Sequence, residues 1–195
     1  MLKFIYGTMA SGKSLHLLST AHNLKENHIR YQLLKPSIDT RTEGTIRSRI
    51  GIEHICTRIH KDEQIYGLID PSVTWLLIDE SQFLTESQVN QLAILADKHK
   101  LNIICYGLRT DYLTRLFEGS KRLFEIADEV TELPSYCECG TKTSVNARIN
   151  SNGEIETSTE GSQIEIGGDE RYKAICRECF FDKVLGIENS KIDEQ

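Results

Sequence analysis

Residues 2–14 read LKFIYGTMASGKS, and this stretch decides the fold. Leu2 to Tyr6 is a short, mostly apolar run with the length of one buried strand. Gly7 to Ser14 then matches G-x-x-x-x-G-K-[ST] in full, and helix-forming residues follow at once. A strand, a glycine-rich loop and a helix in this order predict a phosphate-binding loop. The alternative is a glycine-rich turn that merely connects a strand to a helix, and the agreement of the motif with both flanks disfavours it.

Each residue type in this loop has a chemical reason. Glycines let the backbone curl so that several N–H groups point inward, and the N-terminus of the following helix adds its partial positive charge. The Lys13 ammonium can reach the β- and γ-phosphates of ATP, and the Ser14 hydroxyl can ligate Mg²⁺. The predicted phosphate-binding residues are Gly7, Thr8, Met9, Ala10, Ser11, Gly12, Lys13 and Ser14.

The composition limits the protein's class. The chain has 195 residues, enough for one core and a small appendage, and 29 acidic against 23 basic residues give a net charge of −6. That sign disfavours a dedicated nucleic-acid binder. No apolar run approaches the ~20 residues of a membrane span. Because the N-terminus reads as a strand rather than a secretion leader, we expect a cytoplasmic protein with no membrane contact.

A second motif supplies a carboxylate for the metal. Val73 to Ile78 is a continuous apolar run, typical of a strand buried on both faces of a parallel sheet, and it ends in Asp79-Glu80. This is the Walker B arrangement, so we predict that Asp79 binds Mg²⁺ opposite Ser14. The alternative, that the two acids only begin a loop, leaves the phosphate-binding loop without its metal partner.

Strands and helices alternate over residues 1–133. Besides 2–6 and 73–78, we expect strands at 29–34, 54–57, 101–106 and 129–133, and helices at 13–26, 62–69, 86–98 and 120–128. The first helix should place Leu15, Leu18, Ala21 and His22 near one face. Alternation of this kind predicts an α/β fold, a P-loop parallel sheet flanked by helices, with ligands at the carboxyl ends of its strands.

Two loops carry residues of uncertain role. Arg41, Arg47 and Arg49 lie in a polar segment, where they form either a solvated face or the source of one arginine for the transferring phosphate. Residues 108–119 read as a loop in which the local pattern leaves Tyr112 and Phe117 exposed.

The character of the chain changes after residue 133. Cys137/Cys139 and Cys176/Cys179 supply four thiolates, enough for a closed tetrahedral Zn²⁺ site, and the rival interpretations are disulfides or chance. We predict a P-loop domain over 1–133, a small C-terminal zinc-binding domain over 134–186 and a disordered tail over 187–195. Cys56 and Cys105 stand singly in apolar runs and are interpreted as core residues.

The motifs GTMASGKS, KPSIDTR, SRIG, IDESQFL, CYGLRTDY and IGGDERY follow one another in this order. Walker motifs alone are generic, but DE-x-QF, GLRTD and GG-x₃-Y are specific to one family. Over nearly its whole length the chain resembles the type II thymidine kinases. The resemblance implies transfer of the γ-phosphate of ATP to the 5′-hydroxyl of thymidine, and of deoxyuridine as well. It also implies a RecA-like P-loop core with a small C-terminal zinc-ribbon lid domain, a homotetramer and inhibition by the end product dTTP.

The resemblance implies roles for particular residues. Glu80 matches the general base, which suits a carboxylate beside the metal ligand Asp79. Gln82 and Arg41 join the phosphate-binding candidates. In the family, an aromatic pocket receives the pyrimidine, and the backbone of a loop from the zinc domain binds the thymine edge. The residues that match this nucleoside site are Met9, Phe83, Leu108, Tyr112, Phe117, Asn146, Gln163, Ile164, Glu165, Gly167 and Tyr172. Each aromatic residue could alternatively be ordinary core.

The chain departs from the family at two places, and two rival functions remain open. Asn146 stands where the family often has threonine near the thymine methyl group, and the first cysteine pair is C-x-C instead of C-x-x-C. One rival is a nucleic-acid-dependent P-loop ATPase with a zinc ribbon, which the acidic charge and the aromatic residues disfavour. The other is a nucleotide-binding module without catalysis, which the intact Glu80 disfavours.

Overall fold

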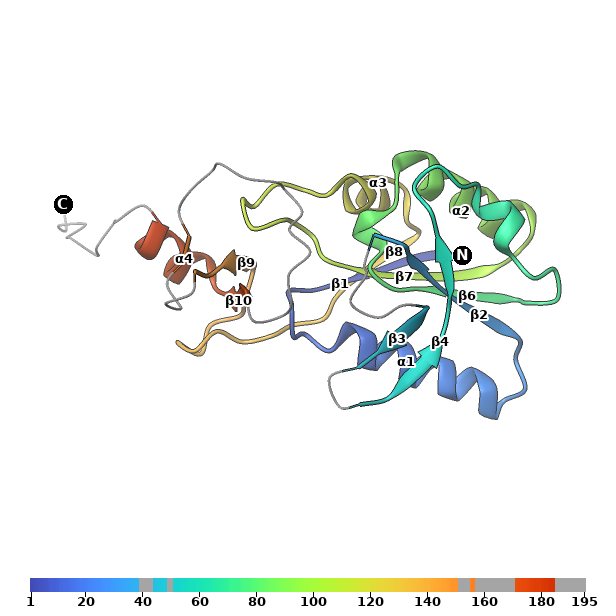
Figure 1. The fold of residues 1–195 in the computed structure, drawn as a ribbon, viewed down its shortest axis with the longest axis horizontal. Helices are drawn as coiled ribbons and strands as arrows, with labels where there is room; N and C mark the ends of the chain where they lie inside the picture. Colours follow the sequence, from blue (N-terminus) through green and yellow to red (C-terminus); the bar gives the residue numbers. More distant parts are fainter. Residues whose placement is uncertain (39–43, 49–50, 151–154, 157–170, 185–195) are drawn as a thin grey trace.

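Six parallel strands form the central sheet in the order β5-β2-β6-β7-β1-β8 (Figure 1). The computed structural model describes residues 1–38, 44–48, 51–150, 155–156 and 171–184. The strands are β1 (Leu2–Tyr6), β2 (Tyr31–Pro36), β5 (Thr57–Ile59), β6 (Trp75–Ile78), β7 (Asn102–Gly107) and β8 (Glu129–Glu132). This arrangement confirms the predicted α/β class.

Helices cover both faces of the sheet. On one face lie α1 (Lys13–Glu26) and the antiparallel pair β3 (Thr45–Arg47) and β4 (Glu53–Ile55). On the other lie α2 (Glu86–Lys98) and α3 (Glu118–Ile126) (Figure 1). Two short 3₁₀ turns, η1 (Ile65–Leu68) and η2 (Ser81–Phe83), complete this part of the chain.

The two faces have separate cores because side chains alternate along each strand. On β6, Leu76 and Ile78 belong to the core that includes α2 and α3, whereas Leu77 belongs to the core that includes α1. All three are fully buried, and each contributes roughly 1.5–3 kcal/mol relative to an exposed side chain. Strands buried on both faces explain why this part of the sequence is continuously apolar.

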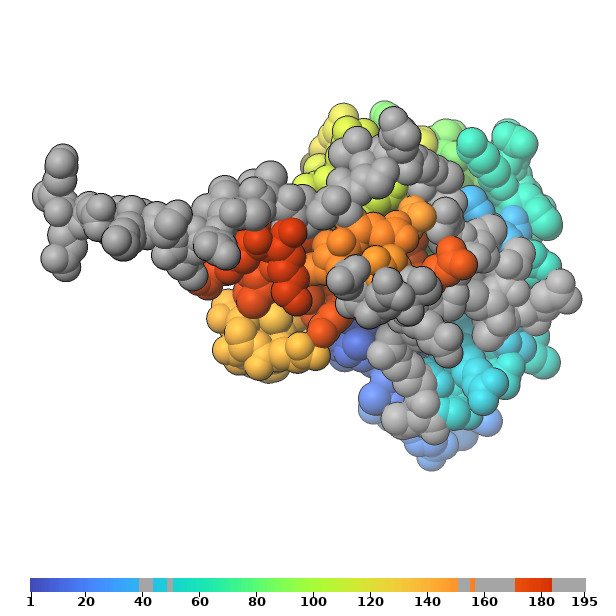
Figure 2. Space-filling model, turned by 60° about the vertical axis from the view of Figure 1, so that its left-hand side comes forward, coloured from blue at the N-terminus to red at the C-terminus, as the bar shows by residue number. Residues whose placement is uncertain are grey.

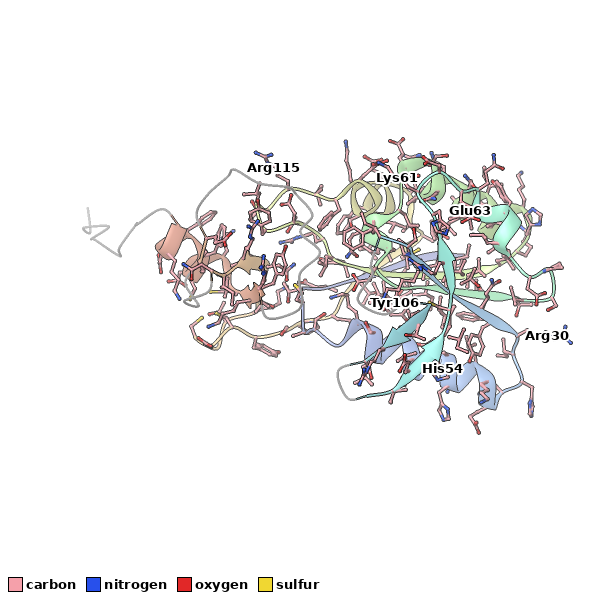
Figure 3. All side chains as sticks on the ribbon, viewed as in Figure 1. Arg30, His54, Lys61, Glu63, Tyr106 and Arg115 are labelled. Carbon is pink, nitrogen blue, oxygen red and sulfur yellow. The ribbon has the colours of Figure 1, made fainter. Side chains whose placement is uncertain are left out.

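Helix α1 buries a different set of residues from the four that were expected near one face. Its buried residues are Leu17, Leu18, Ala21 and Leu24. Of the four expected near one face, Leu18 and Ala21 are buried, and Leu15 and His22 are exposed. Apolar residues occur on several sides of this helix, and contact with the sheet selects among them. The buried hydroxyl of Tyr106 on β7 also contacts α1, at 3.1 Å from His16 Nδ1 and 3.3 Å from Thr20 Oγ1 (Figure 3).

Helix α2 begins as its sequence indicates. The Thr85 hydroxyl accepts the Gln88 N–H at 3.2 Å, and the Gln88 side chain accepts the Thr85 N–H at 3.1 Å, which is a capping box. Such a cap is worth about 1 kcal/mol.

Several local predictions were inaccurate between residues 44 and 69. The expected helix at 62–69 is only the turn η1, and the expected strand at 54–57 is replaced by β4 and β5. β3 falls inside a segment that was expected to be a loop. These elements have three or four residues each, too short for a sequence period to define them.

The C-terminal part lies beyond the carboxyl ends of the sheet strands (Figure 1). It contains the antiparallel strands β9 (Val145–Arg148) and β10 (Tyr172–Ile175) and the helix α4 (Arg177–Val184). A third, smaller core holds it together, made of Cys137, Val145, Ala147, Ile175, Cys176 and Phe180. Among the described residues, no helix is long and apolar enough to span a membrane.

Candidate active site

The phosphate-binding loop joins β1 to α1 at the carboxyl edge of the sheet. Gly12 has a φ of 85°, a left-handed conformation that favours glycine, and Ala10 also has a positive φ of 63°. A Cβ on Gly7 would lie 2.5 Å from Ser11 Oγ and 2.6 Å from the Leu133 carbonyl oxygen. The first position of the motif therefore has no room for a side chain.

The loop presents an N-terminus suited to an anion. No side chain caps the first turn of α1, and no acidic residue lies in that turn. The Lys13 Nζ lies across the loop and donates to the carbonyl oxygens of Gly7 at 3.1 Å and Thr8 at 2.7 Å. The helix dipole and the ammonium both favour a negatively charged ligand at this loop.

The Walker B carboxylate faces the loop as predicted from the motifs. Ser14 Oγ donates to Asp79 Oδ2 at 3.0 Å, so the two Mg²⁺ candidates are adjacent. Burial, and then the neighbouring Glu80, raise the pKa of Asp79 to about 6. The buried Lys35, at the end of β2, opposes this shift. A bound divalent cation would favour the charged carboxylate, so hydroxyl and carboxylate here fit a hard metal ion.

Glu80 adopts a conformation that is uncommon for its residue type. Its φ of 51° and ψ of 36° are left-handed, and strain of this kind clusters at functional sites. The buried Gln82 orients the carboxylate by donating from Nε2 to Glu80 Oε2 at 2.6 Å. The same Gln82 side chain accepts the Leu108 N–H at 3.0 Å through Oε1. Gln82 thus connects the ends of β6 and β7.

The loop after β7 folds its aromatic residues inward. Tyr112 and Phe117 are 4% and 8% exposed, so the expectation that they are exposed was wrong. The reason is a turn organised by Asp111, whose Oδ1 accepts the N–H groups of Leu113 at 2.9 Å and Arg115 at 2.8 Å. A carboxylate that accepts hydrogen bonds from the backbone of its own turn can fix a loop conformation that the local apolar pattern does not predict.

The aromatic candidates form two contacts. Phe83 and Phe117 pack edge to face, with ring centroids 5.6 Å apart. The Arg148 guanidinium of β9 lies 5.2 Å from the ring centroid of Tyr112. Tyr172, on β10, is paired in register with Arg148. These rings therefore come from the sheet part and the C-terminal part of the chain.

The Tyr112 hydroxyl is buried and has no hydrogen-bond partner among the described residues. It is the only buried side-chain nitrogen or oxygen there of which this is true. An unpaired buried hydroxyl costs about 1–3 kcal/mol, so it requires an explanation.

The four cysteine sulfurs converge as predicted. The sulfurs of Cys137, Cys139, Cys176 and Cys179 all lie within 4.8 Å of one another, and C-x-C spacing does not prevent this. Hydrogen bonds from Thr141 lower the pKa of Cys139 to about 6, whereas contact with the sulfurs of Cys176 and Cys139 raises that of Cys179 to about 12. Four sulfurs this close together match the donor set of a closed tetrahedral site. This donor set fits a soft or borderline metal such as zinc.

The predicted site residues divide into those outside the described part of the chain and those beside the phosphate-binding loop. Arg41, Gln163, Ile164, Glu165 and Gly167 lie outside the described residues, as does the predicted tail. Leu108 and Met9 are half-buried beside the site. Asn146 is buried, and its Oδ1 accepts the Met9 N–H at 2.7 Å, so it contacts the phosphate-binding loop directly.

Sequence reasoning missed three residues near the site. Thr143 contacts Thr8 of the loop, Arg109 Nη2 donates to the Ser144 carbonyl at 2.9 Å, and Lys35 influences Asp79. A threonine between two cysteine pairs carries no pattern of its own. Lys35 could have been noticed as a charged residue at the end of a predicted apolar strand.

A phosphate-binding loop that faces a strand-end carboxylate across a parallel sheet defines the class of P-loop nucleotide-binding proteins. Comparison with known proteins then gives the family. A family model described as thymidine kinase matches residues 1–180. The chain is 42% identical to a thymidine kinase of Albidiferax ferrireducens over 192 residues, covering 97% of this chain and 96% of that protein.

Two further relatives have similar coverage. A thymidine kinase of Zymomonas mobilis is 40% identical over 192 residues, or 95% of this chain and 98% of that protein. A thymidine kinase of Pasteurella multocida is 39% identical over 189 residues, which cover 94% of this chain and 97% of that protein. The chain belongs to the thymidine kinase family, a family of phosphate-transferring enzymes. This confirms the resemblance inferred from the motifs.

Proposed function

We propose that the protein transfers the γ-phosphate of ATP to the 5′-hydroxyl of thymidine, and also of deoxyuridine, with Glu80 as general base. The observation that carries this proposal is the position of Glu80. It directly follows Asp79, which accepts a hydrogen bond from Ser14, and its carboxylate is oriented by Gln82. The attacking hydroxyl has to lose its proton close to the metal ion, and a carboxylate beside the metal ligand is in the right position to accept it.

Each group of residues would have a separate role in the reaction. The N–H groups of the loop and the Lys13 ammonium bind and orient the phosphates. Ser14 and Asp79 would hold Mg²⁺, which when bound neutralises charge that develops on the phosphate oxygens. Glu80 accepts the proton from the 5′-hydroxyl as the new P–O bond forms, while the bond between the γ-phosphorus and the β,γ-bridging oxygen breaks and ADP leaves. The buried surroundings of Asp79 exclude water that would otherwise compete for the phosphate.

For the nucleoside we propose the aromatic residues at the carboxyl edge. Phe83 and Phe117 supply apolar rings, and the unpaired hydroxyl of Tyr112 supports the presence of a polar ligand atom nearby. Tyr172, Met9, Leu108 and Asn146 complete the proposed pocket. The backbone around Gln163, Ile164, Glu165 and Gly167 is proposed to bind the thymine edge, and Arg41 to assist the phosphate.

Further properties are proposed on the family's pattern. The four cysteines bind a structural zinc ion in a lid domain over 134–186, separate from the P-loop domain over 1–133. The protein works in the cytoplasm as a homotetramer and is inhibited by dTTP. Zinc is supported by the convergence of the four sulfurs.

The test is phosphate transfer from ATP and Mg²⁺ to a panel of nucleosides, with DNA added in parallel as a stimulant of hydrolysis. We expect dTMP from thymidine, and the ratio of thymidine to deoxyuridine turnover then measures what Asn146 does to the pocket. Hydrolysis stimulated by DNA, without any nucleotide product, would overturn the proposal in favour of a nucleic-acid-dependent ATPase.

A further inference from the structure

Two short hydrogen bonds connect the phosphate-binding loop to the C-terminal part. Thr8 Oγ1 lies 2.7 Å from Thr143 Oγ1, and the Met9 N–H donates to Asn146 Oδ1 at 2.7 Å. Thr8, Thr143 and Asn146 are all buried. Figure 2 shows the surface of the segment that contains the first cysteine pair lying beside the surface of the N-terminal segment. Consecutive residues of the loop are thus bonded to one short segment, residues 143–146.

The direction of the threonine bond follows from the other contacts of Thr143. Its hydroxyl lies 3.1 Å from the Ser135 carbonyl oxygen and donates its single proton there. The Thr8 hydroxyl must then be the donor to Thr143. Both groups of the loop therefore donate, and both groups of residues 143–146 accept. The two acceptors fix where the Thr8 hydroxyl and the Met9 N–H point.

The accepting segment is itself well anchored. The Thr143 N–H donates to the Ser135 carbonyl at 2.8 Å, and the Ser144 N–H donates to the Ile175 carbonyl at 2.9 Å. Asn146 pairs in register with Ala174 of β10, two residues before Cys176. Asn146 thus belongs to β9 and Thr143 to the segment just before it, and both acceptors lie between the two cysteine pairs in the sequence.

Thr143 and Asn146 contact the loop in the conformation in which the Lys13 ammonium donates to the loop's own carbonyl oxygens. Thr8 offers its hydroxyl to Thr143 and its carbonyl oxygen to the Lys13 ammonium at 2.7 Å. The Thr8 carbonyl also accepts the Ser11 N–H at 3.3 Å. Moving Thr8 would therefore displace both the lysine and the turn that shapes the loop.

We propose that Thr143 and Asn146 are positioning residues of the phosphate-binding loop, which fix Thr8 and Met9 from the C-terminal part of the chain. This inference rests on the proposed function only in taking the loop to bind ATP. It assigns to Thr143 a role that its sequence context does not indicate. It also gives Asn146 a task toward the phosphates in addition to its proposed place in the nucleoside pocket.

The test measures ATP binding at equilibrium, together with kcat, KM for ATP and the metal content of each variant. Thr143→Val keeps the shape of the side chain and removes the acceptor. We expect about tenfold weaker ATP binding, the effect of one buried hydrogen bond, with unchanged metal content. Thr143→Ser restores the hydroxyl and should bind ATP within about twofold of the parent, allowing for one lost methyl group.

Asn146 is tested by a matched pair. Asn146→Ala removes the acceptor for the Met9 N–H and should weaken ATP binding about tenfold, whereas Asn146→Asp keeps an acceptor oxygen and should lose less. The control is Lys142→Gln, which removes the exposed ion pair with Glu132, 2.7 Å long, between the same two parts of the chain. Exposed pairs contribute little, so its ATP affinity should not change.

Thr8→Val decides the case even where Thr143→Val fails to fold, because it removes the same hydrogen bond from the loop side. Where both variants fold, adding Thr143→Val to Thr8→Val should weaken ATP binding no further. Unchanged ATP affinity in folded Thr143→Val, or an unfolded Thr143→Val beside a Thr8→Val that binds ATP like the parent, overturns the proposal. Because binding is measured without turnover, failure of the proposed nucleoside reaction would be a separate result.

Discussion

The two sides of the site are built by different means. On the phosphate side, Asp79 and the loop stand at the ends of β6 and β1, whose positions are set by backbone pairing within a sheet that is buried on both faces. On the other side, the described residues between 134 and 184 have a core of six buried residues and four converging sulfurs. The first side is positioned by regular structure and the second by a few specific contacts. A change of one residue should therefore act locally on the first and more widely on the second.

The largest effect is expected at Glu80. Glu80→Gln keeps the size of the side chain but removes the proton acceptor, so kcat should fall by about 10²–10⁴. ATP affinity should stay within about threefold, because Ser14, Asp79 and the loop are untouched. Steady-state kinetics and equilibrium nucleotide binding check this. An unchanged kcat would remove Glu80 as the base.

On the other side, the cysteines should control folding rather than chemistry. Cys176→Ser or Cys179→Ser removes one sulfur from the group, and we expect loss of stoichiometric zinc and early melting of residues 134–184. Metal analysis and thermal unfolding monitored by circular dichroism measure both. Cys56→Ala is the matched control, because Cys56 lies outside the sulfur group. A Cys176→Ser protein with full zinc content and full thymidine affinity would contradict the assignment of Cys176 as a zinc ligand.

Gln82 tests whether a substitution on the sheet side of the site has only a local effect. Gln82→Met has a similar volume but loses both the bond to Glu80 and the acceptor for the Leu108 N–H. We expect kcat to fall about tenfold and stability to fall by about 1–3 kcal/mol, because the partly buried Leu108 N–H loses its acceptor. Thermal denaturation and kinetics on the same sample separate the two. A stable protein with normal kcat would mean that Glu80 needs no support.

The same contrast explains what could be predicted from sequence. The loop, Asp79 and the parallel sheet follow from apolar runs and motifs, because regular structure is defined over short distances. The four cysteines could be grouped by their type alone. The contacts of Thr143 and Asn146 with the loop span more than 130 residues and leave no periodic signal. The burial of Tyr112 was missed because one carboxylate, Asp111, turns the loop against its local pattern.

The smallest expected effect concerns Tyr112, which joins the two sides. Tyr112→Phe removes a buried hydroxyl that has no partner among the described residues, so stability should rise by about 0.5–1 kcal/mol. If that hydroxyl pairs with a polar atom of the bound nucleoside, KM for thymidine should rise about three- to tenfold while KM for ATP stays the same. Denaturant unfolding and kinetics with each substrate varied give both numbers. A gain in stability with no change in the thymidine KM would show that the hydroxyl is only a local cost of folding, and that the nucleoside is recognised by the rings and backbone instead.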